Sequence, residues 1–252
     1  MAFLNHRLVS DARLRPGFRV LDLGSGTGYP ALLAAQAVGG EGEVVGLDLA
    51  EEMLAVARRK AKGLGLSNIT FQAGDVTALP FESASYDAVI SRFCLMFLPN
   101  VHKAVNEAAR VLKPGGYLAA AVWSAVDKNP FLRIPMDVIK NFIPLPPPDP
   151  DQPGIFRLAR PGDLLGAAEK AGLQGVADEE VIGESLYDSE EEYVASLMEM
   201  AAPMQTLFAR LTPEQSREAE SEIKRAAGGY RRGNEISLPM AIRVVAARKP
   251  LI

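Results

Sequence analysis

The chain is poor in cysteine, histidine and tryptophan, and these shortages exclude several kinds of protein. Its 252 residues include one cysteine, Cys94, so no disulfide can form within the chain and no cysteine cluster can hold a metal ion. We therefore expect no metal site. A single thiol also suits a reducing compartment, so the cytoplasm is the predicted location.

Long apolar stretches and basic stretches are missing as well. No part of the chain approaches the roughly 20 apolar residues of a membrane-spanning helix, and Met1–Arg7 lacks the apolar region of a signal peptide. The net charge is −4, and the longest run of lysine and arginine is Arg58–Lys60, which gives no field to attract a phosphate backbone. These absences predict a soluble protein with no membrane span and no nucleic-acid partner. They leave a monomer and a homodimer equally open.

Three glycines at alternate positions interrupt an apolar segment near the N-terminus. Val20–Leu23 has the composition of a buried strand and includes Asp22, and Gly24–Gly28 follows it at once. Glycines in such a turn adopt positive φ angles and let a ligand approach bare backbone. Pro30–Val38, which comes next, has helical composition with a proline in its first turn. Strand, turn and helix in this order predict the start of a βαβ nucleotide site.

A nicotinamide or flavin site is the competing interpretation of the same turn. Its fingerprint, G-x-G-x-x-G, needs a third glycine one place after Gly28, where this chain has Tyr29. Asp48 ends the next apolar segment, Glu43–Asp48, where an acidic side chain can accept from both hydroxyls of a ribose. No arginine stands beside it, so a 2′-phosphate is not expected. The pattern therefore favours a nucleoside ligand other than the dinucleotides.

Five spaced motifs make the chain similar to a known enzyme family. They are the segments Val20–Gly28, Gly46–Ala50 with Met53, Gly74–Val76, Tyr86–Arg92 and Leu112–Gly116. With these motifs in this order, the chain resembles the class I S-adenosylmethionine-dependent methyltransferases. Within that class it is most similar to the methyltransferase type 11 group, which is related to the ubiquinone and menaquinone methyltransferases.

The resemblance implies S-adenosyl-L-methionine as the cofactor and S-adenosyl-L-homocysteine as the product. The residues that it assigns to cofactor binding are Asp22, Gly24, Ser25, Gly26, Thr27, Gly28, Asp48, Leu49, Met53, Gly74, Asp75, Val76, Ser91 and Arg92. In this assignment the glycine turn faces the methionine part, Asp48 binds the ribose, and Leu49 and Met53 contact the adenine. Asp75 accepts from the adenine amino group, and the Val76 N–H faces a ring nitrogen.

Two of these residues, Asp22 and Arg92, have a second interpretation. Asp22 either contacts the cofactor or holds the glycine turn through backbone N–H groups, and the two are evenly matched. The backbone carbonyls of Ser91 and Arg92 are expected to meet the donor's ammonium group. The Arg92 side chain either steers an anionic acceptor or pairs with a structural carboxylate.

Composition and resemblance together imply one elaborated domain over residues 1–252. With 48% hydrophobic and 23% charged residues, the chain can bury a substantial core. The implied fold class is α/β, a Rossmann-like sheet of seven mostly parallel strands with helices on both faces. A mostly helical lid is expected from two insertions, residues 124–160 and 188–232. Family members often carry more sequence before the first strand, so part of the usual N-terminal lid is expected to be missing.

Hydrophobic periodicity and turn residues predict the remaining elements. Helices are expected at Phe3–Leu14, from Ala50, from Asn100 and at Pro161–Ala171, and strands at Ile69–Ala73, Tyr86–Ser91, Tyr117–Val122, Gly175–Gly183 and Leu238–Ala247. Capping boxes at Ser189–Glu192 and Thr212–Gln215 predict two more helices. The regular pattern stops at Ser124, and the prolines of Pro144–Pro150 predict a stiff, extended segment.

The acceptor is predicted to be a small, apolar or aromatic molecule. Aromatic, leucine and methionine residues gather in and beside the second insertion, at Tyr187, Tyr193, Leu197, Met198, Met200, Met204 and Phe208. They suit either a core or an acceptor pocket above the carboxyl ends of the strands. The single cysteine argues against arsenic as the acceptor.

No catalytic residue is assigned. The donor's sulfonium is already electrophilic, so alignment of the acceptor and exclusion of water are the main tasks. His6 and His102 are the two histidines. A solvated surface position is expected for each, with contact to the acceptor as the alternative for His6, which lies in the predicted N-terminal helix. The alternative function is a protein that binds S-adenosylmethionine in a regulatory or structural role without methyl transfer. A nucleic-acid methyltransferase is disfavoured by the acidic charge balance.

Overall fold

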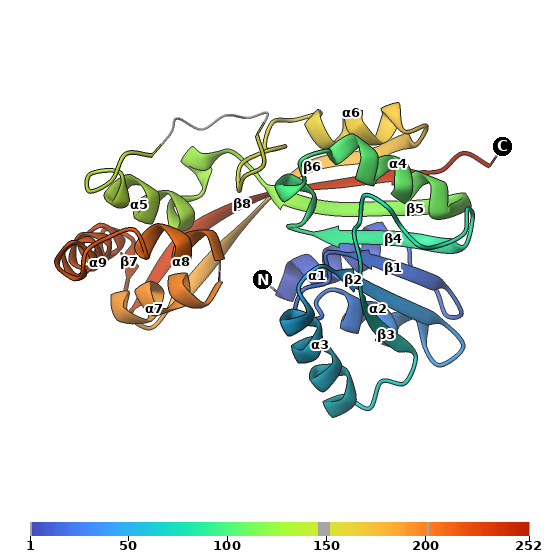
Figure 1. Cartoon of the computed structure of the whole chain (residues 1–252), viewed down its shortest axis with the longest axis horizontal. Helices are drawn as coiled ribbons and strands as arrows, with labels where there is room; N and C mark the ends of the chain where they lie inside the picture. Colours follow the sequence, from blue (N-terminus) through green and yellow to red (C-terminus); the bar gives the residue numbers. More distant parts are fainter. Residues whose placement is uncertain (1, 146–151, 201, 252) are drawn as a thin grey trace. The chain divides into compact units, whose positions relative to one another are not determined.

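In the computed structural model, residues 2–145, 152–200 and 202–251 are described, and the chain divides into two compact units (Figure 1). Unit 1 comprises Met1–Trp123, Pro150–Val181 and Ile242–Ile252, and unit 2 comprises Ser124–Asp149 and Ile182–Ala241. Unit 2 is thus built from two separate segments. They overlap the insertions expected at 124–160 and 188–232, but residues 150–160 belong to unit 1.

Within the described residues, eight strands form one sheet. They are β1 (Arg19–Leu23), β2 (Glu43–Asp48), β3 (Ile69–Ala73), β4 (Tyr86–Arg92), β5 (Leu112–Trp123), β6 (Gln174–Tyr187), β7 (Arg231–Arg232) and β8 (Glu235–Arg248). The order is β3-β2-β1-β4-β5-β8-β6, with β7 paired to β8. Strands β1 to β5 pair in parallel and β8 is antiparallel to β5. The predicted fold class is therefore confirmed, and the strand order reverses between β1 and β4, where ligands bind in such sheets.

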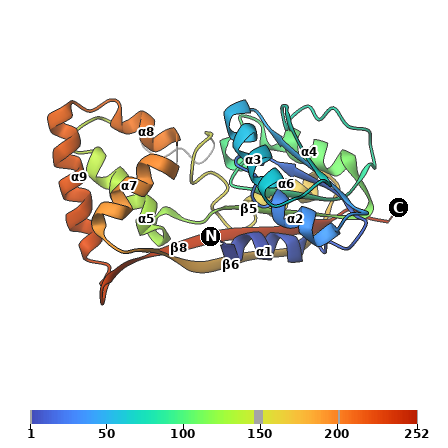
Figure 2. The same ribbon diagram turned by 90° about the horizontal axis from the view of Figure 1, so that it is seen from below.

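Helices cover both faces of the sheet in unit 1. Figure 1 and Figure 2 place α1 (Ala2–Asp11), α2 (Ala31–Val38) and α3 (Glu51–Gly63) on one face, and α4 (Val101–Val111) and α6 (Asp163–Lys170) on the other. A short 3₁₀ helix, η1 (Leu95–Phe97), follows β4. Leu4 and Leu8 of α1, and Ala12 directly after it, are fully buried, and the helix ends at Asp11, earlier than the predicted Leu14. Coverage on both faces explains why the central strands are almost wholly apolar.

Strand β5 begins earlier than the sequence predicts. The expected start was Tyr117, but Leu112 already pairs with Tyr86, and the next pair in the register joins Tyr117 to Ala88. The residues between them, Lys113–Gly116, form an irregularity in which Gly115 has a φ angle of +81°. The Lys-Pro-Gly-Gly sequence is typical of a turn. Because a turn is expected there, the sequence does not indicate that Leu112, on its N-terminal side, already belongs to the strand.

Unit 2 is mostly helical. It holds the 3₁₀ helix η2 (Val126–Lys128) and the helices α5 (Pro130–Ile139), α7 (Glu190–Met200), α8 (Ala202–Phe208) and α9 (Pro213–Gly228). The predicted capping box of α9 is complete, since Thr212 and Gln215 exchange side-chain and backbone hydrogen bonds. At α7 the Ser189 hydroxyl accepts from the Glu192 N–H, but the Glu192 carboxylate accepts from the Asp188 N–H instead of that of Ser189.

Helix α5 corrects the expectation of irregular structure after Ser124. It contains Pro135, which lacks the N–H that would bond the Phe131 carbonyl one turn earlier. The hydroxyl of Tyr193, on α7, donates to that carbonyl at 2.7 Å. The helix therefore survives its proline because another segment of unit 2 satisfies the freed acceptor. No local pattern could have indicated this.

The aromatic and methionine residues of the second insertion pack inside unit 2. Tyr187, Tyr193, Leu197, Met204 and Phe208 are all less than 9% exposed. Their positions match the core interpretation and leave these side chains unavailable to a ligand in this conformation. Two further parts of the sequence predictions, the Met198 and Met200 side chains and most of the Pro144–Pro150 segment, lie outside the described residues.

No helix in the described part of the chain combines the length and apolar composition that a membrane crossing needs. Residues 2–145, 152–200 and 202–251 likewise contain no group of three or more His, Cys, Asp or Glu side chains that could hold a metal ion.

Candidate functional site

The glycine turn lies at the carboxyl end of β1 and is fastened to the end of β2. The N–H groups of Gly24 and Ser25 both donate to the Leu47 carbonyl, at 2.8 and 3.0 Å. Gly24, Gly26 and Gly28 have φ angles of +71°, +51° and +107°. These values lie in the region that L side chains rarely adopt, so the backbone itself requires glycine at all three positions.

Neighbouring atoms also leave little room at two of these glycines. A Cβ atom built on Gly24 would lie 2.4 Å from both Cβ and Sγ of Cys94, which follows β4. One built on Gly28 would lie 3.1 Å from Leu32 and 3.2 Å from Ala57. The turn is thus packed between the segment after β4 and the helices α2 and α3, and its backbone conformation is set by those contacts.

Asp48 holds the glycine turn to the start of α3. One of its carboxylate oxygens accepts from the Gly26 N–H at 2.8 Å, and the other accepts from the Ala50 N–H at 2.9 Å. The sequence offered Asp22 as the residue that holds the turn through backbone N–H groups. In the structure that role belongs to Asp48, because β2 ends directly beside the turn.

Asp22 is instead buried beneath the turn and bonds the first residue of α2. Its side chain is fully buried, and one oxygen accepts from the Ala31 N–H at 3.2 Å. The other oxygen has no hydrogen-bond partner among the described residues. Burial raises the pKa of Asp22 to about 7, with nearby Arg92 and the Ala31 N–H opposing the shift and Asp48 adding to it.

Ser91 and Arg92 close β4 beside the turn. The Ser91 hydroxyl donates to the Leu23 carbonyl at 2.9 Å, which ties β4 to β1 just before Gly24. Arg92 donates from Nη1 to the Asn5 side-chain oxygen on α1, at 2.8 Å. Burial lowers the pKa of the Arg92 guanidinium, and the charge of Asp22 partly restores it. Asn5 was not identified from the sequence. Its position directly after Leu4, an apolar residue of the predicted helix, was a signal that this amide could be buried.

The residues assigned to the adenine form a partly apolar, exposed surface after β2 and β3. Leu49 is 73% exposed and Met53 is 42% exposed, which is unusual for side chains of this kind. The Gly74 N–H donates to the Asp48 carbonyl at 3.0 Å. Asp75 is exposed, and hydrogen bonds from the Thr77 backbone and side chain lower the pKa of its carboxyl group.

Ser25, Thr27 and Val76 offer a ligand little side-chain surface. Ser25 is buried and its hydroxyl has no partner in the described part of the chain, while Thr27 is half-buried in the turn. Val76 is 5% exposed, so its side chain belongs to the core and only its backbone remains for a ligand.

Groups that could exchange a proton with an acceptor are scarce. His6 and His102 are both exposed, as expected. Burial raises the pKa of the Cys94 thiol to about 12, so it stays protonated and unreactive at neutral pH. The structure therefore adds no catalytic base to the sequence prediction.

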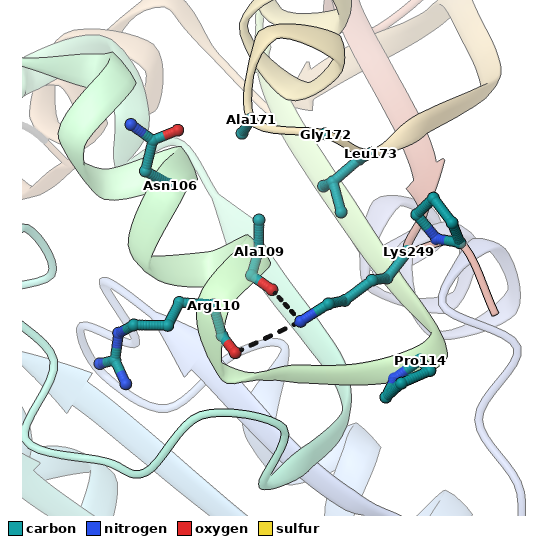
Figure 3. A pocket seen from close by; sticks show the side chains of 9 residues that line it. Asn106, Ala109, Arg110, Pro114, Ala171, Gly172, Leu173 and Lys249 are labelled. Carbon is teal, nitrogen blue, oxygen red and sulfur yellow. Dashed lines mark hydrogen bonds between the residues drawn. The ribbon is translucent and has the colours of Figure 1, made fainter. Parts of the chain in front are cut away.

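A hollow of about 420 Å³ in unit 1 lies away from the glycine turn. Figure 3 shows its lining, from the end of α4 (Ala109, Arg110) to Lys249 after β8. The Lys249 ammonium group donates to the carbonyls of Ala109 at 2.7 Å and Arg110 at 3.4 Å, so its N–H groups serve the end of α4. Pro114, near the start of β5, marks this as the amino-terminal edge of the parallel strands. Ligands of such sheets bind at the opposite edge.

Comparisons with known proteins agree with this geometry. A family model described as a methyltransferase domain matches residues 20–116. The chain is 36% identical over 174 residues to the ubiquinone/menaquinone biosynthesis C-methyltransferase UbiE of Methylobacterium nodulans, covering 66% of this chain and 69% of that protein. It is 33% identical over 165 residues to an arsenite methyltransferase of Halobacterium salinarum, covering 66% of this chain and 39% of that protein. The solved structure of the Bacillus subtilis protein YcgJ matches in fold, with a TM-score of 0.64, 21% identity and 99% coverage of both chains.

The chain spans 69% of the relative from Methylobacterium nodulans but about half or less of the length of other curated relatives it matches. The family model nevertheless covers every segment that builds the turn and its surroundings except α1, from β1 through Asp48 and Asp75 to Arg92. Sheet order, turn geometry and sequence identity thus agree. The chain belongs to the class I S-adenosylmethionine-dependent methyltransferases, in the group that includes the ubiquinone and menaquinone methyltransferases.

Proposed function

We propose that this chain transfers a methyl group from S-adenosyl-L-methionine to a small, apolar or aromatic acceptor. The observation that carries the proposal is the glycine turn, which is held to the end of β2 beside Asp48. Its three glycines adopt positive φ angles and carry no side chains, so a ligand can lie directly against the backbone of the turn. When bound, the donor supplies a methyl group already activated on a sulfonium. The residues of this chain therefore bind and orient the donor and keep water out.

The residues around the turn fit the parts of such a donor. Asp48 accepts from two backbone N–H groups, but each carboxylate oxygen has a second lone pair that a ribose hydroxyl can use. Leu49 and Met53 offer exposed apolar surface to the adenine ring. Asp75, whose lowered pKa keeps it ionised, is an acceptor for the adenine amino group. The backbone of the turn takes the methionine part.

We assign the choice of acceptor to the two insertions, residues 124–160 and 188–232, which the sequence predicts to form a mostly helical lid. The family model ends at residue 116, so all of unit 2 lies outside the part that this chain shares with methyltransferase domains in general. The relative from Methylobacterium nodulans is named for ubiquinone and menaquinone biosynthesis, which supports an aromatic acceptor. Asp22 is not the proton acceptor, because its side chain is fully buried despite a pKa of about 7.

Titration calorimetry tests the donor assignment first. S-adenosyl-L-homocysteine is expected to bind with a measurable heat, and NAD is expected to give none, because Tyr29 occupies the place of the third dinucleotide glycine. Tight NAD binding without a response to S-adenosyl-L-homocysteine would contradict the proposal. Incubation with methyl-labelled donor and a panel of hydroxylated aromatics and quinones then tests transfer. Donor binding with no labelled product from any acceptor would favour the alternative of a binding protein.

Replacing Asp48 by alanine should weaken S-adenosyl-L-homocysteine binding roughly 10- to 100-fold, about 1.5–3 kcal/mol. The loss has two sources, the ribose hydrogen bonds and the anchoring of Gly26. Glu43→Ala, at the other end of β2, is the matched control, because Glu43 is exposed and forms a surface ion pair with Arg19, far from the turn. Donor affinity that stays unchanged while the melting temperature falls would reject the ribose role and leave Asp48 as an anchor alone.

A further inference from the structure

Residues 152–160, called the strap below, are the part of the first insertion that packs within unit 1. The strap consists of bends and turns and leads into α6. Its apolar side chains Ile155, Phe156 and Leu158 are half-buried. Because no helix or strand ladder runs through the strap, its position depends on a few hydrogen bonds to the rest of unit 1.

Two of these hydrogen bonds form a latch between the strap and η1. The Gly154 N–H donates to the Met96 carbonyl at 3.1 Å, and the Arg157 guanidinium donates to the Leu98 carbonyl. Helix η1 begins directly after Cys94, which packs against the glycine turn. The latch therefore lies close to the carboxyl end of β4, the edge at which ligands of such sheets bind.

The other end of the strap is anchored to the sheet through buried charges. Arg243, on β8, is 5% exposed, and its Nε donates to the Ala159 carbonyl at 3.3 Å. Its Nη1 donates to one oxygen of Asp178 at 2.6 Å, and the second oxygen of Asp178 accepts from the Gly162 N–H at 2.6 Å. Separating a buried ion pair leaves an uncompensated charge, so this end is held more firmly than a latch of two bonds to neutral carbonyls.

A strained residue lies between the latch and the anchor. Leu158 has a φ angle of +65°, which is rare for a bulky side chain. The cost of this conformation is of the same order as the contribution of one hydrogen bond. Opening the strap at Leu158 relieves the strain, while the two latch bonds oppose the opening. The closed strap is therefore balanced between two opposing effects of similar size.

We infer that the strap is a hinged gate, which opens away from η1 at Leu158 and controls the entry of the acceptor at the carboxyl end of β4. The gating role rests on the proposed function. When the latch closes, an acceptor that has entered beside η1 is retained and shielded from water. Arg157 is a positioning residue, because it acts on the acceptor only through the Leu98 carbonyl and the closed strap.

Amide hydrogen exchange, followed by NMR on the unmodified chain, tests the hinged strap. The Gly154 amide should exchange by local opening, at a rate that low urea concentrations leave unchanged, and the Gly162 amide should exchange more slowly. Arg157→Met should speed exchange at Gly154 about 2- to 10-fold, the effect of losing one hydrogen bond, and leave Gly162 unchanged. Arg157→Lys keeps a donor for the Leu98 carbonyl and should recover most of the slow exchange.

Arg160→Met is the matched control, because Arg160 lies on the far side of Leu158 and pairs with Asp163 of α6. It should leave the exchange rate of the Gly154 amide unchanged.

Methyl transfer tests the gating role. The probe is the compound, from a panel of hydroxylated aromatics and quinones, that gives the most labelled product with the unmodified chain. Arg157→Met should raise the KM for this compound about 2- to 10-fold and leave the affinity for S-adenosyl-L-homocysteine unchanged. Arg157→Lys should return the KM toward that of the unmodified chain. A strap that served only the stability of unit 1 would not separate these two ligands.

Equal exchange rates at Gly154 and Gly162, both accelerated by urea, would overturn the inference, because the strap would then open only when unit 1 unfolds. Faster exchange at Gly154 in Arg157→Met with an unchanged KM would overturn the gating role. If no compound of the panel gave labelled product, the proposed function would be overturned and the gating role with it. The exchange rates would still decide separately whether the strap is hinged.

Discussion

Replacing Gly24 by alanine is expected to destabilise unit 1 by about 2–5 kcal/mol. The new Cβ atom would lie 2.4 Å from both Cβ and Sγ of Cys94, a distance that real Cβ contacts essentially never show. The backbone at Gly24 also has a φ angle of +71°, which an alanine adopts only with strain. Either Cys94 or the turn must move, and a displaced turn weakens donor binding as well.

The variant Gly17→Ala separates backbone strain from the clash with Cys94, the two causes of the expected destabilisation. Gly17 has a φ angle of +82°, but a Cβ atom there would meet nothing within 4 Å, so only the backbone strain of about 1–2 kcal/mol applies. Adding Cys94→Gly to Gly24→Ala removes the clashing atoms and should recover part of the stability. Urea unfolding followed by the fluorescence of Trp123, the one tryptophan of the chain, measures unit 1 in each variant. Equal losses for Gly17→Ala and Gly24→Ala would show that packing against Cys94 contributes nothing.

The parts of the fold that depend on local pattern could be predicted from the sequence. The strand Ile69–Ala73 was found to the residue, because its apolar Ile69 and Phe71 alternate with polar residues, as in a strand with one buried face. The helix that begins after Asn100 was found through its cap, whose side-chain oxygen accepts from the Lys103 N–H. Glycine spacing located the turn, since all three glycines adopt positive φ angles that other residues rarely adopt.

Features that depend on distant contacts could not be predicted. Helix α5 relies on the Tyr193 hydroxyl to satisfy a carbonyl that Pro135 leaves free, and the two residues are far apart in sequence. The roles of the two aspartates could not be assigned either. Both follow apolar strand residues, and only the pairing of β1 with β2 shows that Asp48, and not Asp22, reaches the Gly26 N–H of the turn. Sequence spacing cannot distinguish two carboxylates at adjacent strand ends.

The burial of Asp22 predicts an unusual dependence of stability on pH. Its pKa of about 7 in the folded chain is well above the ordinary value of 3.8, because burial disfavours the charged form. The folded state therefore keeps a proton that the unfolded chain has already released between those two values. The stabilising contribution is fully present below about pH 4, falls as the pH rises toward 7, and is lost above it.

The expected size of this effect is about 4 kcal/mol between pH 4 and pH 8, since each pKa unit corresponds to about 1.4 kcal/mol. Asp22→Asn isolates it, because asparagine cannot ionise and can still accept from the Ala31 N–H. Any constant offset from the new amide group cancels when stabilities are compared across pH. Relative to the variant, the unmodified chain should lose stability steadily from pH 4 to pH 7 and then level off. Trp123 fluorescence in urea at each pH provides the measurement. Because Arg92 lowers the pKa of Asp22, Arg92→Met should extend the decline above pH 7. A constant difference between Asp22→Asn and the unmodified chain at every pH would mean that Asp22 titrates normally, and that the unpartnered oxygen is solvated in the folded protein.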